Sequence, residues 1–296
     1  MACGARSELF APEETDAEID APLDVVHHDA VPDVFDASEE DALPPIDAFP
    51  DVPVPTDCPD AGSTLVYVIS DDNELYSFYP PTLAFTAIGT VSCPSKSSPF
   101  SMAVNRLGVA YSVFQDGNLF KISTANATCT ATTFVPNQDG FLTFGMGYAG
   151  QPDGGDTLYV AEGHYTGDSK GLASIDTTSF AFSFIGAFTP PLTQCELTGT
   201  GDGRLFAFCL PFGTTGSTLA EIDPTNANVI AANTLMVGSS ADSFAYAFWG
   251  GDFWIFTAPA STTTVTQYDP VTKSETSVAT FGKAIVGAGV STCAPQ

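Results

Sequence analysis

Basic residues are scarce in this chain of 296 residues. Eight Lys and Arg residues stand against 35 Asp and Glu residues, which gives a formal net charge of −27. Proteins bind nucleic-acid backbones mainly through Lys and Arg, which displace the counterions of the phosphates. The sequence therefore argues against DNA or RNA as a partner.

Long apolar runs are absent as well. A membrane-spanning helix needs about 20 consecutive, mostly apolar residues, and no segment approaches that length. Neither the HExxH motif of zinc proteases nor the GxxxxGK[ST] phosphate loop occurs. We therefore expect no integral membrane domain, and nothing in the sequence points to a particular reaction.

The acidic residues are unevenly distributed and divide the chain in two. Seventeen of them lie in residues 1–61, where Arg6 is the only basic residue. This part is rich in Asp, Glu, Pro and Ala and has too few apolar residues to offset the entropy of ordering. We predict a disordered, acidic tether over residues 1–61 and a folded domain over residues 62–296.

The start of the chain, Met1 to Gly4, resembles the end of a bacterial lipobox, in which a small residue precedes the lipidated cysteine. The basic and apolar regions of a signal peptide would lie upstream. By this resemblance Cys3 carries the lipid, and the glycine after it implies export to the outer membrane. The acidic tether would then hold the folded domain away from the membrane surface.

Residues 62–296 consist of short apolar runs bounded by Gly, Asp, Asn and Pro, as in an all-β domain. One run with its turn recurs as LYSFYPPT, LFKISTAN, LASIDTTS, LAEIDPTN and VTQYDPVT, starting at Leu75, Leu119, Leu172, Leu219 and Val265. Other apolar runs precede each copy, so the repeat unit is a four-stranded meander. Repeats of this length are typical of propellers.

The first repeat lacks its first strand, and an extra strand, AIVGAGVST, follows the last repeat. A C-terminal strand that completes the first blade closes a propeller and removes its exposed edges. We predict a five-bladed β-propeller; a sixth blade is the alternative if the longest repeat hides one, and a β-sandwich is the second choice of fold.

The repeated turns resemble those of bacterial secreted propellers of the YVTN, SMP-30 and NHL types, whose blades often carry LYxxD-like turns. The resemblance covers about four-fifths of the chain and implies a surface or periplasmic propeller. Enzymes, binding proteins and scaffolds share this blade pattern, so the resemblance implies the fold and not an activity.

Seven cysteines leave six to pair if Cys3 is lipidated. Cys195 and Cys209 are almost equidistant from a Gly-Asp-Gly turn and should face each other across a hairpin. Cys58 and Cys293 flank the closing blade, and Cys93 and Cys129 remain by elimination. Three disulfides would indicate an oxidising compartment.

In a propeller, the loops between the second and third strands of each blade and the loops that link blades usually share one face. This pattern places on that face a mainly acidic set: Asp71, Asp72, Glu74, Lys96, Asp116, Asp139, Glu162, His164 and Asp242. From it we select Asp72, Asp116, Glu162, His164 and Asp242 as ligand-face candidates. Converging carboxylates would suit Ca²⁺, and the alternative is that these residues serve only as turn formers.

Other patterns also have a structural interpretation. The repeated Asp176, Asp223 and Asp269 should cap their own turns. Tyr246, Trp249 and Trp254 suggest a stacking platform for sugars or packing between blades. The expected inner strands carry almost no acids, and only Glu196 lies close to one.

The leading hypothesis is therefore a non-catalytic, monomeric surface lipoprotein that presents a binding face to a protein or glycan. No cofactor is expected. The alternatives are an extracellular hydrolase or lactonase-like enzyme that uses Ca²⁺ at the acidic face, and a purely structural envelope protein.

Overall fold

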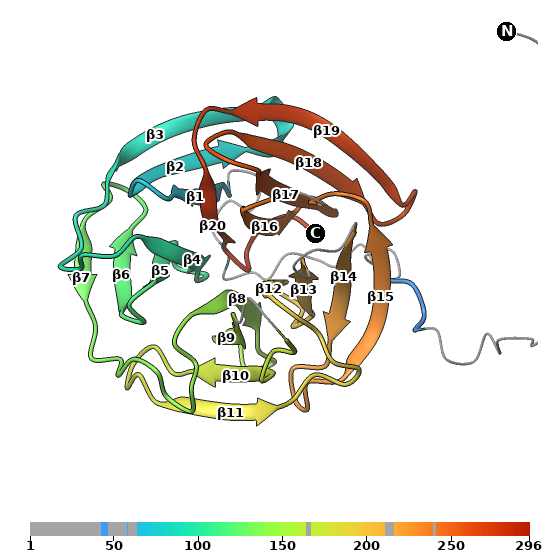
Figure 1. The fold of residues 1–296 in the computed structure, drawn as a ribbon, viewed down its shortest axis with the longest axis horizontal. Helices are drawn as coiled ribbons and strands as arrows, with labels where there is room; N and C mark the ends of the chain where they lie inside the picture. Colours follow the sequence, from blue (N-terminus) through green and yellow to red (C-terminus); the bar gives the residue numbers. More distant parts are fainter. Residues whose placement is uncertain (1–42, 47–57, 59–63, 164–166, 211–215, 239–240) are drawn as a thin grey trace, which may run out of the picture. The chain divides into compact units, whose positions relative to one another are not determined.

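The computed structural model describes residues 43–46, 58, 64–163, 167–210, 216–238 and 241–296. Over these residues, five antiparallel sheets of four strands each surround a common axis (Figure 1). This arrangement confirms the five-bladed β-propeller. Among the described residues, no helix is long and apolar enough to cross a membrane.

Each blade runs from an inner strand at the axis to an outer strand at the rim. Blade 1 is β20 (Ile285–Val290), β1 (Val66–Ser70), β2 (Glu74–Tyr79) and β3 (Ala84–Thr90), with the short 3₁₀ helix η3 (Pro80–Thr82) between its outer two strands. Blade 2 is β4 (Pro99–Val104), β5 (Val109–Phe114), β6 (Leu119–Ser123) and β7 (Cys129–Ala131). Blade 3 is β8 (Phe144–Gly150), β9 (Asp156–Glu162), β10 (Leu172–Ile175) and β11 (Phe182–Gly186). Blade 4 is β12 (Cys195–Gly199), β13 (Leu205–Cys209), β14 (Ser217–Ile222) and β15 (Val229–Leu235). Blade 5 is β16 (Ser243–Trp249), β17 (Asp252–Ala258), β18 (Thr263–Asp269) and β19 (Ser274–Phe281).

The C-terminal strand completes the first blade, as the sequence predicts. Strand β20 pairs antiparallel with β1, with Val66 opposite Val290 and Ile69 opposite Gly287. The last strand of the chain is thus the innermost strand of the blade that contains the first. Because the two ends of the repeat share one sheet, the ring has no open edge between them.

Glycines let neighbouring inner strands approach closely. A Cβ atom on Gly145 of β8 would lie 2.0 Å from the carbonyl oxygen of Cys195, and one on Gly147 would lie 2.7 Å from that of Leu197. Such distances leave no space for any side chain. The matching order of these contacts shows that β8 and β12 run in the same direction, so both strands begin on the same face of the ring.

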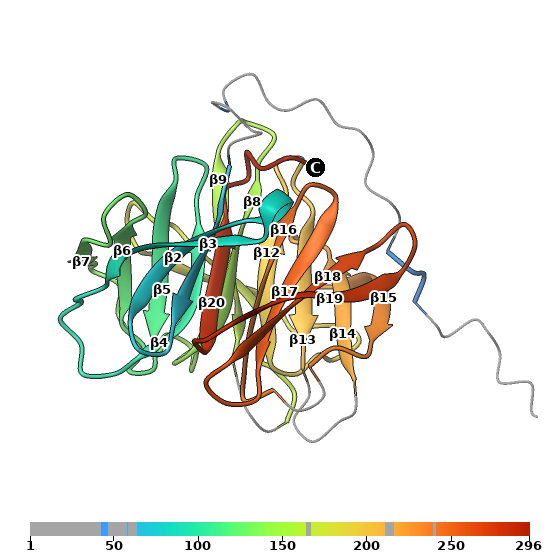
Figure 2. The same ribbon diagram turned by 90° about the horizontal axis from the view of Figure 1, so that it is seen from above.

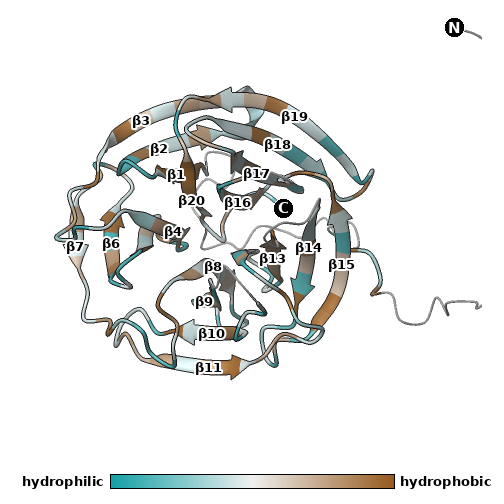
Figure 3. Cartoon of the chain, viewed as in Figure 1, coloured by the Kyte–Doolittle hydropathy of each residue, from teal (hydrophilic) through white to brown (hydrophobic). Residues whose placement is uncertain are grey.

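Five apolar clusters form the core, and each lies between two neighbouring blades. Aromatic rings supply much of the packing; Phe253, for example, is fully buried and contacts Phe206, Phe248 and Tyr268. The outer strands β3, β15 and β19 carry both apolar and polar residues (Figure 3), and most of their residues are half-buried or exposed.

Three disulfides are present, and they are the three pairs inferred from the sequence. Cys58 bonds to Cys293, Cys93 to Cys129, and Cys195 to Cys209. The last pair joins directly opposed residues of β12 and β13. These bonds indicate an oxidising extracellular or periplasmic environment.

Four residues of the predicted tether pack on blade 4. The backbone N–H of Ala232 in β15 donates a hydrogen bond of 2.9 Å to the carbonyl oxygen of Pro44. Ile46 is 2% exposed and lies in the cluster between blades 4 and 5. The prediction of a disordered tether is therefore wrong for residues 43–46. Most of the tether, including Cys3, lies outside the described residues.

The C-terminal segment, residues 291–296, covers the end of the ring at which the inner strands finish. The hydroxyl of Thr292 donates to Asp156 Oδ1 at 2.7 Å, and the N–H of Gly250 donates to the carbonyl oxygen of Pro295 at 2.7 Å. A side view shows the C-terminus at that end (Figure 2). The segment thus links blades 3 and 5 across one mouth of the ring.

Candidate functional site

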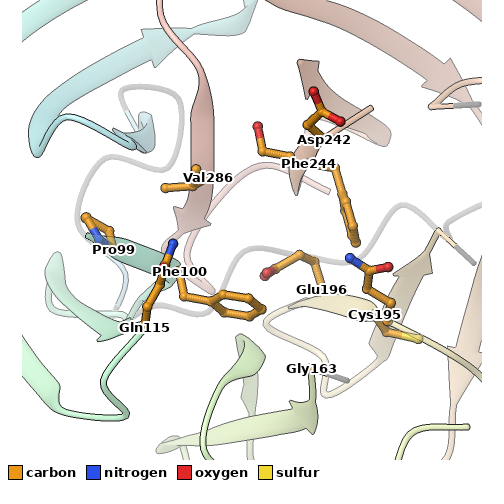
Figure 4. A pocket seen from close by; sticks show the side chains of 11 residues that line it. Pro99, Phe100, Gln115, Gly163, Cys195, Glu196, Asp242, Phe244 and Val286 are labelled. Atoms are coloured by element: carbon orange, nitrogen blue, oxygen red, sulfur yellow. The ribbon is translucent and has the colours of Figure 1, made fainter. Parts of the chain in front are cut away.

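A cup lies at the opposite end of the ring, where the inner strands begin. Its volume is about 100 Å³, and Figure 4 shows it from close by. Loops that link blades and loops that join second to third strands surround it, and we call this surface the channel-mouth face. The loop pattern of the sequence places the ligand-face candidates on this same face.

Four of the lining residues occupy the same position in their strands. Phe100, Glu196, Phe244 and Val286 are the second residues of β4, β12, β16 and β20. The inner strands begin together on this face, so these four side chains form one layer around the axis. The fifth inner strand, β8, has Gly145 at this position, and its missing side chain leaves that side of the layer open.

Polar groups surround the apolar layer. Gln115 follows β5, Gln194 precedes β12, and Asp242 precedes Ser243, the first residue of β16. Gln194 has a backbone φ of +48°, which is uncommon outside glycine and is concentrated at functional sites. The Oγ atom of Ser243 is buried and has no hydrogen-bond partner among the described residues.

Glu196 is the buried acid of the cup, 5% exposed. The hydroxyl of Ser101 in β4 donates a hydrogen bond of 2.6 Å to its Oε2 atom. Strands β4 and β12 belong to blades 2 and 4, which are not neighbours, so this bond crosses the ring. It adds a polar contact to a layer whose other members, Phe100, Phe244 and Val286, are apolar.

Burial raises the pKa of the Glu196 carboxyl well above its usual range. The hydrogen bond from Ser101 and the backbone N–H of Met146 act in the opposite direction but do not offset the desolvation. Burial, together with the charge of Glu196, also raises the pKa of Tyr246 well above its usual range. Burial therefore favours the protonated form of the Glu196 carboxyl.

The candidates chosen from the sequence occupy different places on the channel-mouth face. Asp242 is exposed and lines the cup. Asp116 directly follows the lining residue Gln115, and Glu162 directly precedes the lining residue Gly163. His164 lies outside the described residues.

Three of these carboxylates accept hydrogen bonds from protein groups. Lys283 Nζ lies 2.7 Å from Asp72 Oδ2 and 2.7 Å from Glu74 Oε2, and its hydrogen bond lowers the pKa of Asp72. Asp116 accepts from the hydroxyl of Ser95 at 2.8 Å. Burial acts to raise the pKa of Asp116, but the hydrogen bonds to Ser95 and Asn118 outweigh it, so the net shift is downward. Glu162 accepts from the backbone N–H of Lys170 at 3.1 Å.

The remaining members of the acidic set are also engaged in local structure. The N–H of Asp71 donates to the carbonyl oxygen of Ala284, and the carbonyl oxygen of Asp139 accepts from Lys170 Nζ at 3.0 Å. Lys96 is exposed. Within the described part of the chain, no three His, Cys, Asp or Glu residues are grouped as a metal site.

The repeated aspartates serve as turn caps. Asp176 accepts from the N–H groups of Thr178 and Ser179, and Asp223 and Asp269 make the equivalent bonds in their turns. Trp249 and Trp254 donate their indole N–H groups to the backbone, and their rings contact blade 1. With Tyr246 fully buried, these aromatic residues pack between blades and do not form a sugar platform.

One pentapeptide, GDSKG at positions 167–171, matches the GxSxG pattern of a nucleophile elbow. That elbow requires an exposed serine between a strand and a helix. Here Ser169 is 8% exposed, precedes β10, and donates its hydroxyl to the carbonyl oxygen of Glu162 at 2.9 Å. The serine therefore stabilises its own loop.

The sequence did not single out most of the cup. Phe100, Gln115, Gln194, Ser243 and Phe244 have no charge pattern, and the sequence distinguishes Glu196 only as the acid closest to an inner strand. Their common signal is position: each lies at or next to the start of an inner strand or at the end of a second strand. That signal becomes readable once the blades are aligned.

No protein-family model matches the chain, and no curated protein sequence matches it. Solved structures of similar fold include a nidogen/laminin complex, with 13% identity over 76% of this chain and 84% of that chain and a TM-score of 0.45. A Bacteroides thetaiotaomicron protein of unknown function has 14% identity over 64% of this chain and 53% of that chain, with a TM-score of 0.45. A PQQ-bound aldose sugar dehydrogenase from Streptomyces coelicolor has 14% identity over 86% of this chain and 91% of that chain, with a TM-score of 0.43.

Proposed function

We propose that the protein is a non-catalytic binding protein, anchored outside the cell through Cys3, whose propeller presents the channel-mouth face to a protein partner. The cup is the observation that carries this proposal. Apolar side chains at one level of the ring, with polar groups around them, are the usual composition of a recognition pocket. The disulfides support a location outside the cytoplasm.

The carboxylates of the face favour binding over hydrolysis. Glycosidases place two carboxyl groups on either side of the bond to be broken, about 5–10 Å apart. On this face the oxygens of Asp72, Asp116 and Glu162 accept hydrogen bonds from protein donors, and Glu196 is held by Ser101. These contacts commit Asp72, Asp116 and Glu162 to the structure of the loops.

The test of the binding role measures attachment of the purified full chain to intact cells of the source bacterium. Phe244→Ala and Asp242→Lys alter the cup and its rim, and we expect each to weaken attachment at least tenfold. Val271→Ala and Asp153→Asn, in loops on the opposite face, are the matched controls and should attach normally. Equal attachment of all variants would contradict the proposal.

The chemical class of the partner is resolved by treating the cells before attachment is measured. Loss after protease treatment, with no loss after periodate oxidation, is expected for a protein partner. The reverse result would identify a glycan. Attachment that resists both treatments and both cup variants would favour a purely structural envelope protein.

Anchoring is tested by the intact mass of protein isolated from its native envelope. We expect acyl chains on Cys3, so that the protein enters the detergent phase, and we expect Cys3→Ser to abolish this partitioning. An unmodified Cys3 in the native protein would remove the anchor from the proposal. The binding role of the face would then have to stand alone.

A further inference from the structure

The size of the cup limits what can enter it. An apolar cavity of about 150 Å³ accommodates a benzene ring, and the cup, at about 100 Å³, is smaller. It therefore suits the end of a narrow side chain better than a sugar ring. This inference rests on the proposed binding role of the channel-mouth face and concerns the chemical group that the cup receives.

The charge of the cup favours a cation. Glu196 is more than nine-tenths buried, lines the cup, and among the described residues forms no ion pair with Lys or Arg. Among the described residues, the other titratable groups considered beside the cup are Tyr246, from β16, and Asp242, at the rim. Ser101 from β4 and the N–H of Met146 from β8 contribute dipoles and no charge.

We propose that the cup binds a primary ammonium group, supplied by a lysine side chain of the protein partner. An ammonium group has three donors and no acceptor. The carboxylate of Glu196, the unpartnered Oγ of Ser243 and the amide oxygen of Gln115 or Gln194 offer the three acceptors. The rings of Phe100 and Phe244 line the cup where the butyl chain of lysine would pass, and aromatic faces attract such cations.

Binding changes the protonation of Glu196. In the free protein, burial without a neighbouring cation favours the protonated carboxyl. An ammonium group beside it favours the carboxylate, so the proton leaves to solvent as the ion pair forms. One proton is released for each ammonium bound, and affinity rises by up to tenfold per pH unit until the pH reaches the raised pKa of the free carboxyl.

Neutral and anionic groups fit these features less well. A neutral ligand would leave Glu196 protonated and would not use its charge. An anion would approach two carboxyl groups, Glu196 and Asp242, on a chain with a net charge of −27. Only a cation is attracted electrostatically by both carboxyl groups.

The experiment is calorimetric titration of the full chain with Nα-acetyl-lysine methylamide between pH 6 and 8.5, in buffers of different ionisation enthalpy. We expect release of close to one proton and tighter binding at higher pH. The ε-acetylated derivative, which lacks the charge, should bind at least tenfold more weakly. n-Butylamine, which carries the same ammonium group on a butyl chain without the peptide backbone, is titrated as a second ligand.

Variants separate the role of Glu196 from general effects on the face. Glu196→Gln should weaken binding at least tenfold and abolish proton release, whereas Ser243→Ala should weaken it a few-fold and keep the release. Asp168→Asn, at an exposed acid outside the cup, is the control. Melting curves check that each variant is folded. If Glu196→Gln does not fold, the Ser243→Ala variant still tests the cup.

Several results would overturn the inference. These are no binding of either amine, binding without proton release, or unchanged binding to Glu196→Gln. If n-butylamine binds with proton release and the lysine derivative does not, the cup binds an ammonium group but not that of a lysine side chain. If neither amine binds but Phe244→Ala still abolishes attachment to cells, the ammonium inference fails and the proposed binding function stands.

Discussion

Ser101 and Glu196 are 95 positions apart in the sequence, yet a hydrogen bond of 2.6 Å joins their side chains across the ring. Ser101 is fully buried, and its neighbour Ser112 donates to its carbonyl oxygen. The buried acid is thus held by a hydroxyl and not by a cation. Its protonation state should influence both stability and recognition.

The first prediction concerns how stability depends on pH. The pKa of Glu196 is raised in the folded state, so the folded protein retains a proton that the unfolded chain loses above about pH 4.3. Stability from this group is therefore complete below that pH and falls as pH rises towards the folded pKa. Glu196→Gln should flatten this fall and melt at a higher temperature than the wild type at pH 8.

Calorimetric melting curves between pH 4 and 8 measure this difference. Asp72, Asp176, Asp223 and Asp269 have lowered pKa values and give the opposite slope, with stability lost as pH falls below about 4. These four aspartates are present in both the wild type and Glu196→Gln, so they affect the two melting profiles equally. Parallel melting profiles for wild type and Glu196→Gln would refute the prediction.

The second prediction ranks the disulfides by the chain length that each one closes. Cys58–Cys293 spans 235 residues, Cys93–Cys129 spans 36, and Cys195–Cys209 spans 14. In the loop-entropy view, their stabilisations are about 5, 4 and 3 kcal/mol. Double Cys→Ser variants of each pair, compared by denaturant unfolding, should lose free energy of unfolding in that order.

A reversed order would show that packing around the individual bonds matters more than loop length. Reduction of all three should destabilise the wild type more than any double variant. A wild type that unfolds at the same denaturant concentration with and without reductant would contradict the stabilising role itself.

The third prediction tests the packing of residues 43–46. Ile46 is 2% exposed in the cluster between blades 4 and 5, and truncation of such a side chain to alanine costs about 2–4 kcal/mol. Ile46→Ala should therefore lower the free energy of unfolding by that amount. Val271→Ala is the control, because Val271 is 68% exposed and its truncation should have little effect. Equal behaviour of the two variants would mean that Ile46 does not pack.

The fourth prediction concerns calcium. The carboxylates of the channel-mouth face that would bind it accept hydrogen bonds from Lys283, Ser95 and the N–H of Lys170. We therefore expect neither excess EDTA nor added Ca²⁺ to change the melting temperature. A rise in melting temperature with Ca²⁺ that EDTA reverses would instead support the hydrolase alternative.

The ring itself was readable from the sequence, because strand periodicity and repeated turns are local signals. The strand left over after Ala284 and the missing strand of the first repeat together fixed the closure, and the spacing of Cys195 and Cys209 around a turn fixed their register. These inferences need only that a strand has a period of two and that neighbouring repeats stack.

The cup was not readable in the same way. Its layer is assembled from Phe100, Glu196, Phe244 and Val286, which are far apart in the chain and share only their position in the inner strands. The pattern of charged residues points instead to Asp72 and Asp116, whose oxygens accept hydrogen bonds from loop residues. The packing of Ile46 was also missed, because an apolar residue in an acidic, proline-rich segment gives no local sign that it has a partner.

The C-terminal segment spans one end of the ring, and the Ser101–Glu196 bond crosses its interior. Among the described residues, both features lie away from the rim of the cup, so the cup is approached from the channel-mouth face. Two ligands that need the cup would therefore compete for it, and each would lower the apparent affinity of the other.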